Sequence, residues 1–364
     1  MSAPELPPCP GLTAGQRLRL PLLSQRFECS WHPGHQELRR WNTSWIVEEL
    51  YEGDYRRAVG MLENATWALV AMGFPQAPHE NIDRLKAVCD LSAWWFDIDD
   101  EIMRILADSG TGQGQRRGLV RSYSEKVWGL LTEGRPVPGA PWNTDAVREM
   151  ASRLMEIPGF GDIAHAAFTA WQIDGHKNEA DGLNTSDDVV RNFLRMRAST
   201  GACHAYELLT ESILGIRIPQ EVKDRPVVAA YREAIEDTWV LPNDLLSSRR
   251  ECFQGDHDGN IVCLLRRLHG LSLQGAVDEA ARLLMDRHTR ALSLFEKALA
   301  EDGEETRGLR TYLKAFQHIG AANQRWSYMT PRYHGSGFYW NGVLSGELIL
   351  ETDCTVFPPV EAVG

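Results

Sequence analysis

From about residue 36 to about residue 350, apolar residues recur every three or four positions in long segments separated by Gly, Pro, Asn and Asp. This spacing places apolar side chains on one face of an α-helix, so the pattern predicts helices nearly throughout. No run of alternating apolar and polar residues convincingly predicts a strand. The 364 residues can bury a sizeable core, and no fixed repeat indicates a solenoid. The sequence therefore predicts one all-α domain built as a helical bundle.

The two ends of the chain differ from this helical region. Residues 1–35 are rich in proline and lack periodicity, which predicts an extended N-terminal arm. Residues 351–364 predict a flexible C-terminal tail, and 36–350 form the predicted helical domain. Glycine, proline and polar positions mark the helix boundaries. The predicted helices include 54–72, 186–214, 304–319 and 322–331.

Charge and cysteine content argue against several classes of protein. With 38 basic and 50 acidic residues the net charge is -12, and no run of Lys or Arg indicates nucleic acid or an anionic membrane as a partner. The seven cysteines are scattered and form no C-x-x-C pair, which favours a reducing compartment. Neither a secretory signal nor an apolar stretch of roughly 20 residues is present. We therefore expect a cytoplasmic protein without stable membrane association.

One predicted helix carries a polar triplet at strict four-residue spacing: Asn243, Ser247 and Glu251. Four residues turn a helix by about 400° and climb about 6 Å, so the three side-chain oxygens lie on one face. This set suits Mg²⁺, which takes few protein ligands and completes its octahedron with water and substrate phosphate oxygens. An ordinary polar helix face gives the same spacing, so the triplet needs support from elsewhere in the chain.

That support comes from the segment 91–103, LSAWWFDIDDEIM. Clustered carboxylates repel one another and raise each other's pKa unless a cation lies among them, so a metal is their natural partner. The abrupt change from aromatic to acidic residues indicates an apolar cavity with an acidic mouth. The polar shoulder of an amphipathic helix is the alternative interpretation. The residues concerned are Trp94, Trp95, Phe96, Asp97, Asp99, Asp100 and Glu101.

Together the two segments resemble the metal motifs of class I terpene synthases, particularly the single-domain sesquiterpene cyclases of bacteria and fungi. Asp99 and Asp100 match the leading pair of the family's D-D-x-x-D motif, although Met103 stands in place of its third acid. Residues 243–251 meet every defined position of N-D-x-x-S-x-x-x-E, which is the most specific part of the resemblance.

Further positions match the family at the expected distances. Arg197 lies where the family has an arginine that senses the diphosphate, and Thr200 and Gly201 match the linker and effector positions at a helix break. Just before the final Glu of the second motif, Arg250 stands where a basic residue commonly contacts the diphosphate. The segment 326–333, WSYMTPRY, has the spacing of a pocket wall and a diphosphate clamp.

The resemblance implies Mg²⁺-dependent ionisation and cyclisation of an allylic isoprenyl diphosphate, most simply farnesyl diphosphate, with release of inorganic diphosphate. It implies three Mg²⁺ ions and a monomer or homodimer. The implied metal ligands are Asp99, Asn243, Ser247 and Glu251, with Asp100 and Glu101 as further candidates. The implied catalytic residues are Arg197, Thr200, Gly201, Arg250, Arg332 and Tyr333. The implied apolar wall consists of Trp95, Phe96 and Trp326.

Several alternatives remain open on the sequence. A diterpene synthase would act on geranylgeranyl diphosphate, and a catalytically silent relative would only bind isoprenoids. Residues 97–100 also spell the D-x-D-D motif of class II cyclases, whereas a chain-elongating synthase would need a second aspartate-rich motif. The segment 255–260, GDHDGN, is interpreted as a turn, because Ile261 occupies the glycine position of a calcium-binding loop.

Overall fold

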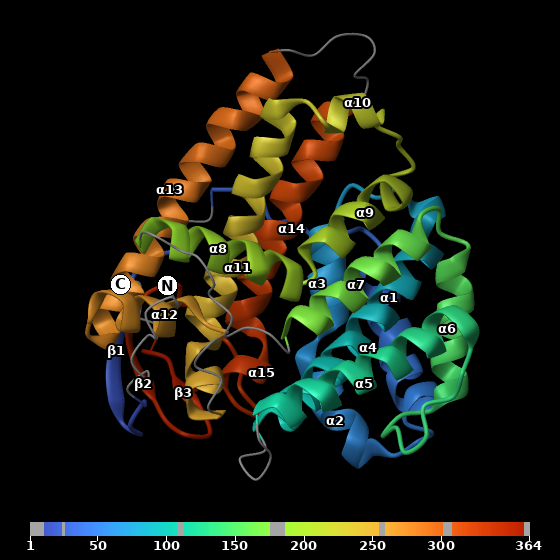
Figure 1. Cartoon of the computed structure of the whole chain (residues 1–364), viewed down its shortest axis with the longest axis horizontal. Coiled ribbons are helices and arrows are strands. Elements are labelled where there is room, and N and C mark those ends of the chain that lie inside the picture. Colours follow the sequence, from blue (N-terminus) through green and yellow to red (C-terminus); the bar gives the residue numbers. More distant parts are fainter. Residues whose placement is uncertain are drawn as a thin grey trace.

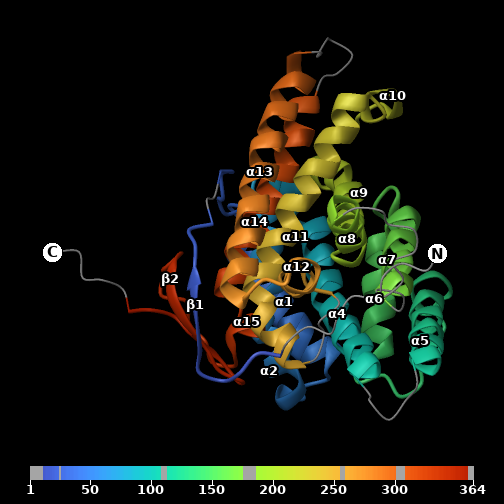
Figure 2. The same ribbon diagram turned by 60° about the vertical axis from the view of Figure 1, so that its left-hand side comes forward.

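The computed structural model describes residues 11–23, 26–107, 113–174, 186–254, 259–300 and 308–359. Within these ranges the chain is a bundle of helices, so the all-α prediction is confirmed (Figures 1 and 2). The helices enclose a cavity. The longer helices are α1 (His35–Ser44), α2 (Tyr55–Asn64), α3 (Thr66–Gly73), α4 (Ile82–Ala107), α5 (Gln113–Glu133), α6 (Thr144–Met155), α7 (Phe160–Asp174), α8 (Ser186–Thr200), α9 (Cys203–Leu214), α11 (Pro226–Gln254), α12 (Ile261–His269), α13 (Leu273–Ala300) and α14 (Leu309–Met329). Shorter helices are the π-helix η1 (Trp45–Leu50), the 3₁₀ turn η2 (His79–Asn81), α10 (Gln220–Lys223) and α15 (Pro331–His334).

Helix α11 lies at the centre of the bundle. Its residues are buried on every face between 234 and 242 and nearly so to 249, as expected for a helix surrounded by others. It packs chiefly against α13 and α14, and α14 in turn packs against α3. No helix within the described residues is both long enough and apolar enough to cross a bilayer.

The predicted single helix 186–214 is wrong, because the structure divides it into α8 and α9. Ala202 has a φ of 60°, in the left-handed region, and ends the helical path between Thr200 and Cys203. The N–H of Gly201 donates to the Arg197 carbonyl at 2.7 Å, and a Cβ on Gly201 would lie 2.9 Å from that oxygen. A glycine is therefore needed at this break. The predicted helix 54–72 is divided in the same way at Ala65, whose φ is 51°.

The opposite error concerns the C-terminal region, where two predicted helices, 304–319 and 322–331, meet in the single helix α14. Residues 304–307 lie outside the described ranges. The predicted gap contains Gly320, which is helical in the structure. A Cβ on Gly320 would lie 2.7 Å from the indole of Trp239, whose Nε1 donates to the Phe316 carbonyl at 2.9 Å. The glycine thus marks a close approach of α14 to α11 and does not end a helix.

Three short strands, which the pattern did not predict, bring the two ends of the described chain together. β1 (Gln16–Leu20) pairs antiparallel with β2 (Gly346–Leu350), which pairs with β3 (Thr355–Val356). The side chain of Gln274 on α13 bonds both backbone groups of Arg19 on β1, at 2.8 and 2.9 Å. β1 does alternate, with Leu18 and Leu20 buried, but five residues are too few for a convincing pattern. Figure 2 shows the sheet beside the C-terminal helices.

Candidate active site

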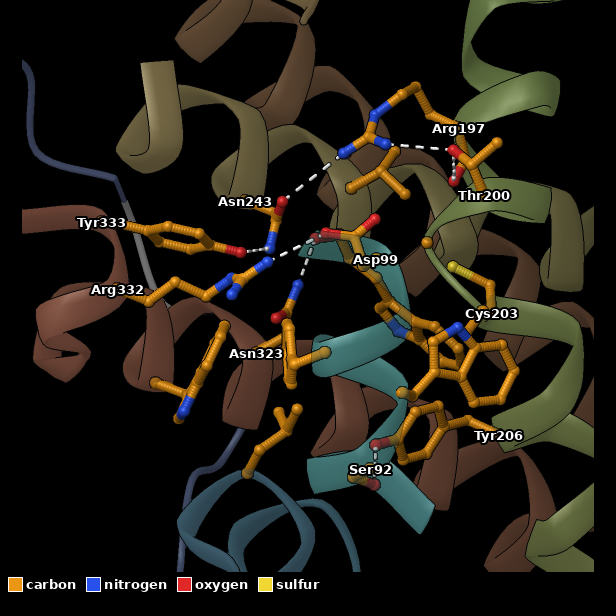
Figure 3. Close-up of a pocket in the computed structure, with 18 of the residues that line it drawn as sticks. Ser92, Asp99, Arg197, Thr200, Cys203, Tyr206, Asn243, Asn323, Arg332 and Tyr333 are labelled. Carbon is orange, nitrogen blue, oxygen red and sulfur yellow. Dashed lines mark hydrogen bonds and ion pairs between the residues drawn. The ribbon is translucent and has the colours of Figure 1, made fainter. Parts of the chain in front are cut away.

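A cavity lies among α3, α4, α8, α9, α11, α14 and α15, and Figure 3 shows many of the side chains that line it. It brings together residues from five separate parts of the sequence. Most of the residues implied by the resemblance are among them. These are Trp95, Phe96, Asp99, Arg197, Thr200, Gly201, Asn243, Arg250, Glu251, Trp326, Arg332 and Tyr333.

Helix α11 contains a proline one residue before its metal motif begins. Pro242 has no N–H and therefore cannot bond the carbonyl of Thr238, which weakens the helix ladder at this point. The next carbonyl, that of Trp239, accepts a hydrogen bond from Asn323 Nδ2 of α14 at 2.6 Å. Asn323 also lines the cavity. This contact therefore fixes α11 against α14 where the motif starts.

The orientation of the Asn243 amide follows from its neighbour on α15. Asn243 Nδ2 donates to the Tyr333 hydroxyl at 2.8 Å, and Oδ1 lies on the side of Arg197, a residue that can only donate. Oδ1 is 3.5 Å from Arg197 Nη2, a long contact. The amide oxygen thus lies at the cavity, and Arg197 is a weak partner for it at this distance.

Asp244 joins three helices next to the cavity. Its buried carboxylate accepts Arg197 Nε and Nη2 on Oδ1, at 3.0 and 2.6 Å, and the Ile261 N–H at the start of α12 on Oδ2, at 2.9 Å. Arg197 Nη1 also donates to Thr200 Oγ1 at 3.0 Å. The Arg197 guanidinium is therefore held toward the cavity from two sides.

Ser247 does not line the cavity, but its environment fits a metal ligand. The side chain is fully buried, and its Oγ has no hydrogen-bond partner among the described residues. A buried hydroxyl without a partner is unusual, and it lies on the same helix face as Asn243 and Glu251. No group of three or more His, Cys, Asp or Glu side chains in the described ranges could hold a metal. A metal site here would therefore need amide and hydroxyl oxygens beside carboxylates.

Glu251 is held by Asn260, a residue whose role sequence reasoning missed. Asn260 Nδ2 donates to Glu251 Oε2 and to the Asp244 carbonyl, both at 2.7 Å. Its Oδ1 accepts the Val262 N–H at 2.8 Å and caps α12. Residues 255–258 of the predicted turn lie outside the described ranges. An asparagine directly before an apolar helix is a capping signal that could have identified Asn260.

On the opposite side of the cavity, two arginines pair with the aspartates of α4. The buried Arg332 donates to Asp99 at 2.9 Å and to Asp100 at 2.7 and 2.8 Å, and Arg250 Nη2 lies 2.6 Å from Asp100. Burial alone would raise the pKa of Asp100, but Arg332 and Arg250 outweigh it and lower this pKa to about 2. The carboxylate is therefore ionised at neutral pH.

Three acids of the α4 cluster, Asp97, Asp100 and Glu101, are not among the residues that line the cavity. Glu101 pairs with Arg104 on the same helix. Asp97 accepts a hydrogen bond from the Tyr51 hydroxyl at 2.8 Å, and burial raises its pKa to about 6. The first acid of the D-x-D-D motif thus contacts Tyr51, directly after η1, and does not line the cavity. Met103, at the position of the absent third acid, lines the cavity.

The apolar wall is a contiguous aromatic group. Phe96 stacks on Trp326 with ring centroids 5.2 Å apart, and Trp326 meets Tyr333 edge-on at 5.4 Å. The guanidinium carbon of Arg332 lies 4.7 Å from the centroid of Phe96, so the wall reaches the charged end of the cavity. Trp326 Nε1 donates to the Asn64 carbonyl at 2.6 Å. Sequence reasoning did not predict the lining residues Leu69, Gly73, Ser92, Ala202, Cys203, Tyr206, Trp239, Val240, Gln254, Ile319 and Asn323.

Comparison with known proteins identifies relatives along nearly the whole chain. Residues 132–290 match the family model "Terpene synthase family 2, C-terminal metal binding". A (3S,6E)-nerolidol synthase from Selaginella moellendorffii is 32% identical over 341 residues, covering 92% of this chain and 87% of the relative. Sesquiterpene synthase 6 from Postia placenta is 30% identical over 309 residues, covering 83% and 86%.

Solved structures share the fold. A protein named SVS_A2, from ancestral sequence reconstruction, superposes with a TM-score of 0.67 at 22% identity, covering 94% of this chain and 96% of its own. Wild-type cucumene synthase superposes with a TM-score of 0.60 at 20% identity, covering 83% and 98%. At these identities the likeness concerns the arrangement of helices.

Proposed function

This chain belongs to the class I terpene synthases, enzymes that act on isoprenyl diphosphates, and on this premise we propose that it converts farnesyl diphosphate to a cyclic sesquiterpene with Mg²⁺. The observation that carries the proposal is one cavity lined by Asp99 of α4 and by Asn243 and Glu251 of α11, above an aromatic wall. A substrate with an anionic head and an apolar tail matches these two ends. The relatives named as sesquiterpene synthases support the fifteen-carbon substrate.

The residues at the charged end fit Mg²⁺. Carboxylate, amide and hydroxyl oxygens are ligands this ion prefers. Ser247 Oγ has no hydrogen-bond partner in the part of the chain that the structure describes, which supports a ligand role at that position. When bound, the ions supply Lewis-acid neutralisation of the diphosphate, with three ions expected as in the family. Asp100 is a further candidate ligand, whereas Glu101 is less well placed because it pairs with Arg104. The proposed ligands are Asp99, Asn243, Ser247 and Glu251.

The arginines would bind the diphosphate and stabilise its departure. Arg332 and Arg250 now neutralise Asp99 and Asp100, and a diphosphate competes for the same guanidinium N–H groups. Their transfer to the diphosphate would release the two carboxylates toward the cavity. As the carbon–oxygen bond breaks, its electron pair leaves with the diphosphate, and the N–H groups of Arg197 and the other arginines stabilise the growing negative charge.

The aromatic wall would protect the allylic cation that remains. Water would quench this cation, so the tail end of the cavity has to exclude it during cyclisation. The faces of Trp95, Phe96 and Trp326 stabilise positive charge by roughly 0.5–2 kcal/mol each when desolvated. The carbon chain then closes on itself within the shape that these rings define.

Purified full-length protein with Mg²⁺ and the ten-, fifteen- and twenty-carbon diphosphates tests the proposal. We expect cyclic products by gas chromatography and stoichiometric diphosphate release, fastest with farnesyl diphosphate. Glu251→Gln should lose both signals while keeping its helical circular dichroism, whereas Glu133→Gln, an exposed substitution on α5, should keep both. Absence of diphosphate release from all three substrates would indicate a silent relative, and preference for the twenty-carbon substrate would indicate a diterpene synthase.

The cytoplasmic location is part of the same proposal. The six cysteines within the described ranges form no disulfide, which agrees with a reducing compartment. They are Cys29, Cys89, Cys203, Cys252, Cys263 and Cys354.

A further inference from the structure

Two hydroxyl groups lie at the end of the cavity away from the charged residues. Ser92 precedes Asp99 by seven residues on α4, which is two helical turns and about 10 Å along the helix axis on the same face. Tyr206 reaches the same place from α9, and both line the cavity. Figure 3 shows this pair at a distance from Arg332 and Asn243. A chain bound by its diphosphate would therefore extend its tail toward these two hydroxyls.

The hydrogen bonds of the pair define where the protons lie. Ser92 Oγ is 2.7 Å from the Val88 carbonyl, which can only accept, so the single Ser92 proton points to that carbonyl. The Tyr206 hydroxyl, 2.8 Å from Ser92 Oγ, must then be the donor of the second bond. The phenolic proton consequently points to Ser92, and the lone pairs of the Tyr206 oxygen remain available to a ligand in the cavity.

The position of the Tyr206 ring is also fixed. Phe74 stacks on it with nearly parallel planes, 16° apart, at a centroid distance of 6.3 Å. Burial raises the pKa of Tyr206 to about 12, so the phenol stays neutral at physiological pH. Among the described residues this oxygen accepts no hydrogen bond, although Leu69, Gly73 and Ile319 make much of the nearby lining apolar. The acceptor capacity of this oxygen is therefore available to a ligand in the cavity.

We propose that Tyr206 is a specificity-determining residue, whose oxygen, oriented by Ser92, stabilises positive charge at the distal end of the isoprenyl chain. The proposal rests on the proposed function. A fixed dipole with its negative end toward the chain favours cations located there over cations near the diphosphate, and the low local polarity strengthens this preference. Tyr206 would thereby select which carbon bears the charge before the last proton is lost. Ionisation of the diphosphate, which takes place at the other end of the cavity, does not depend on Tyr206.

The test compares product composition with diphosphate release in full-length protein supplied with Mg²⁺ and farnesyl diphosphate. Tyr206→Phe keeps the ring and removes only the oxygen. We expect diphosphate release within about twofold of the unmodified protein. The ratio of the major product to the others should change by about fivefold or more, which corresponds to the loss of an ion–dipole contact of about 1 kcal/mol. Tyr312→Phe, on a buried tyrosine of α14 outside the cavity lining, should change neither quantity.

Ser92→Ala gives a second, independent readout. It removes the acceptor of the phenolic proton, which becomes free to turn toward the cavity, so the product ratio should again change while diphosphate release is retained. An unchanged product ratio in both variants would overturn the inference. So would the loss of diphosphate release from folded Tyr206→Phe, because the residue would then act in ionisation. If unmodified protein releases no diphosphate, the proposed function fails, and this inference fails with it.

Discussion

Asp244→Asn provides the sharpest test of how the charged end of the cavity is held together. The two carboxylate oxygens both accept: Oδ1 receives two N–H groups of Arg197, and Oδ2 receives the Ile261 N–H. An amide has only one acceptor oxygen. In either orientation of the new side chain, its NH₂ group therefore faces another donor, and the buried charge of Arg197 loses the carboxylate that pairs with it.

The expected loss of unfolding free energy follows from the burial of the Asp244–Arg197 pair. The side chain of Asp244 is 1% exposed and that of Arg197 10%, so solvent does little to screen the pair. Removing one partner of such a pair costs about 3–5 kcal/mol of unfolding free energy. The same two helices contain a matched surface pair, Arg195 and Glu233, with side chains 63% and 40% exposed. Glu233→Gln should therefore cost less than about 1 kcal/mol.

Urea unfolding followed by circular dichroism measures both variants. We expect Asp244→Asn to lower the unfolding free energy by at least about 2 kcal/mol more than Glu233→Gln does. The slope of the unfolding free energy against urea concentration, the m-value, should stay unchanged. Under the proposed function, kcat/KM of Asp244→Asn should also fall by about 10²-fold, because Arg197 is no longer aimed at the diphosphate. Equal unfolding free energies for the two variants would refute the argument that burial decides the strength of the pair.

Three further changes have defined outcomes. Burial lowers the pKa of His334 from 6.5 to about 4. The neutral ring therefore contributes about 3 kcal/mol to the unfolding free energy above pH 6.5, and this contribution is lost as the pH falls from 6.5 to 4. Urea unfolding across this range should show the loss, and His334→Gln should make the unfolding free energy less dependent on pH. Asn260→Asp brings a carboxylate against Glu251, so the Mg²⁺ concentration for half-maximal diphosphate release should rise about tenfold. An unchanged concentration would exclude a role of Asn260 in positioning Glu251. Arg332→Lys cannot contact Asp99 and Asp100 through a planar fork, and single-turnover kinetics should show ionisation slowed by about 10²-fold, whereas an unchanged rate would remove Arg332 from the site.

Much of the fold and the cavity was predictable because the relevant information is local in the sequence. Helical periodicity gives the fold class, and the four-residue spacing within 243–251 is enough to place three oxygens on one helix face. The break at Gly201 followed from the resemblance to a family. Periodicity alone extended one helix through it, because the flanking apolar residues keep their spacing on both sides.

The features that could not be predicted are contacts between segments distant in sequence. Gly320 has the appearance of a helix end, and only the packing of Trp239 shows that it is a close approach. Ser92 and Tyr206 are 114 residues apart, and neither stands in a motif. Asn260 has a local capping signal, but its bond to Glu251 requires the turn between α11 and α12 to bring it back to the motif. The local sequence pattern predicts which face of a helix a residue lies on, whereas tertiary packing determines which distant residue it contacts.

The sheet that joins the chain ends has a consequence for the order of folding. Arg17 and Glu347, which pair across β1 and β2, are 330 positions apart, and closing so long a loop is entropically slow compared with forming local helices. Arg249 reaches from α11 to the carbonyls of Tyr333 and Thr352, so the same closing event seats α15. In a nascent chain, Arg332 and Tyr333 of α15 are therefore not held in place until residues 346–356 have been synthesised. Removing β2 and β3 should impair the cavity at α15 before it melts the bundle.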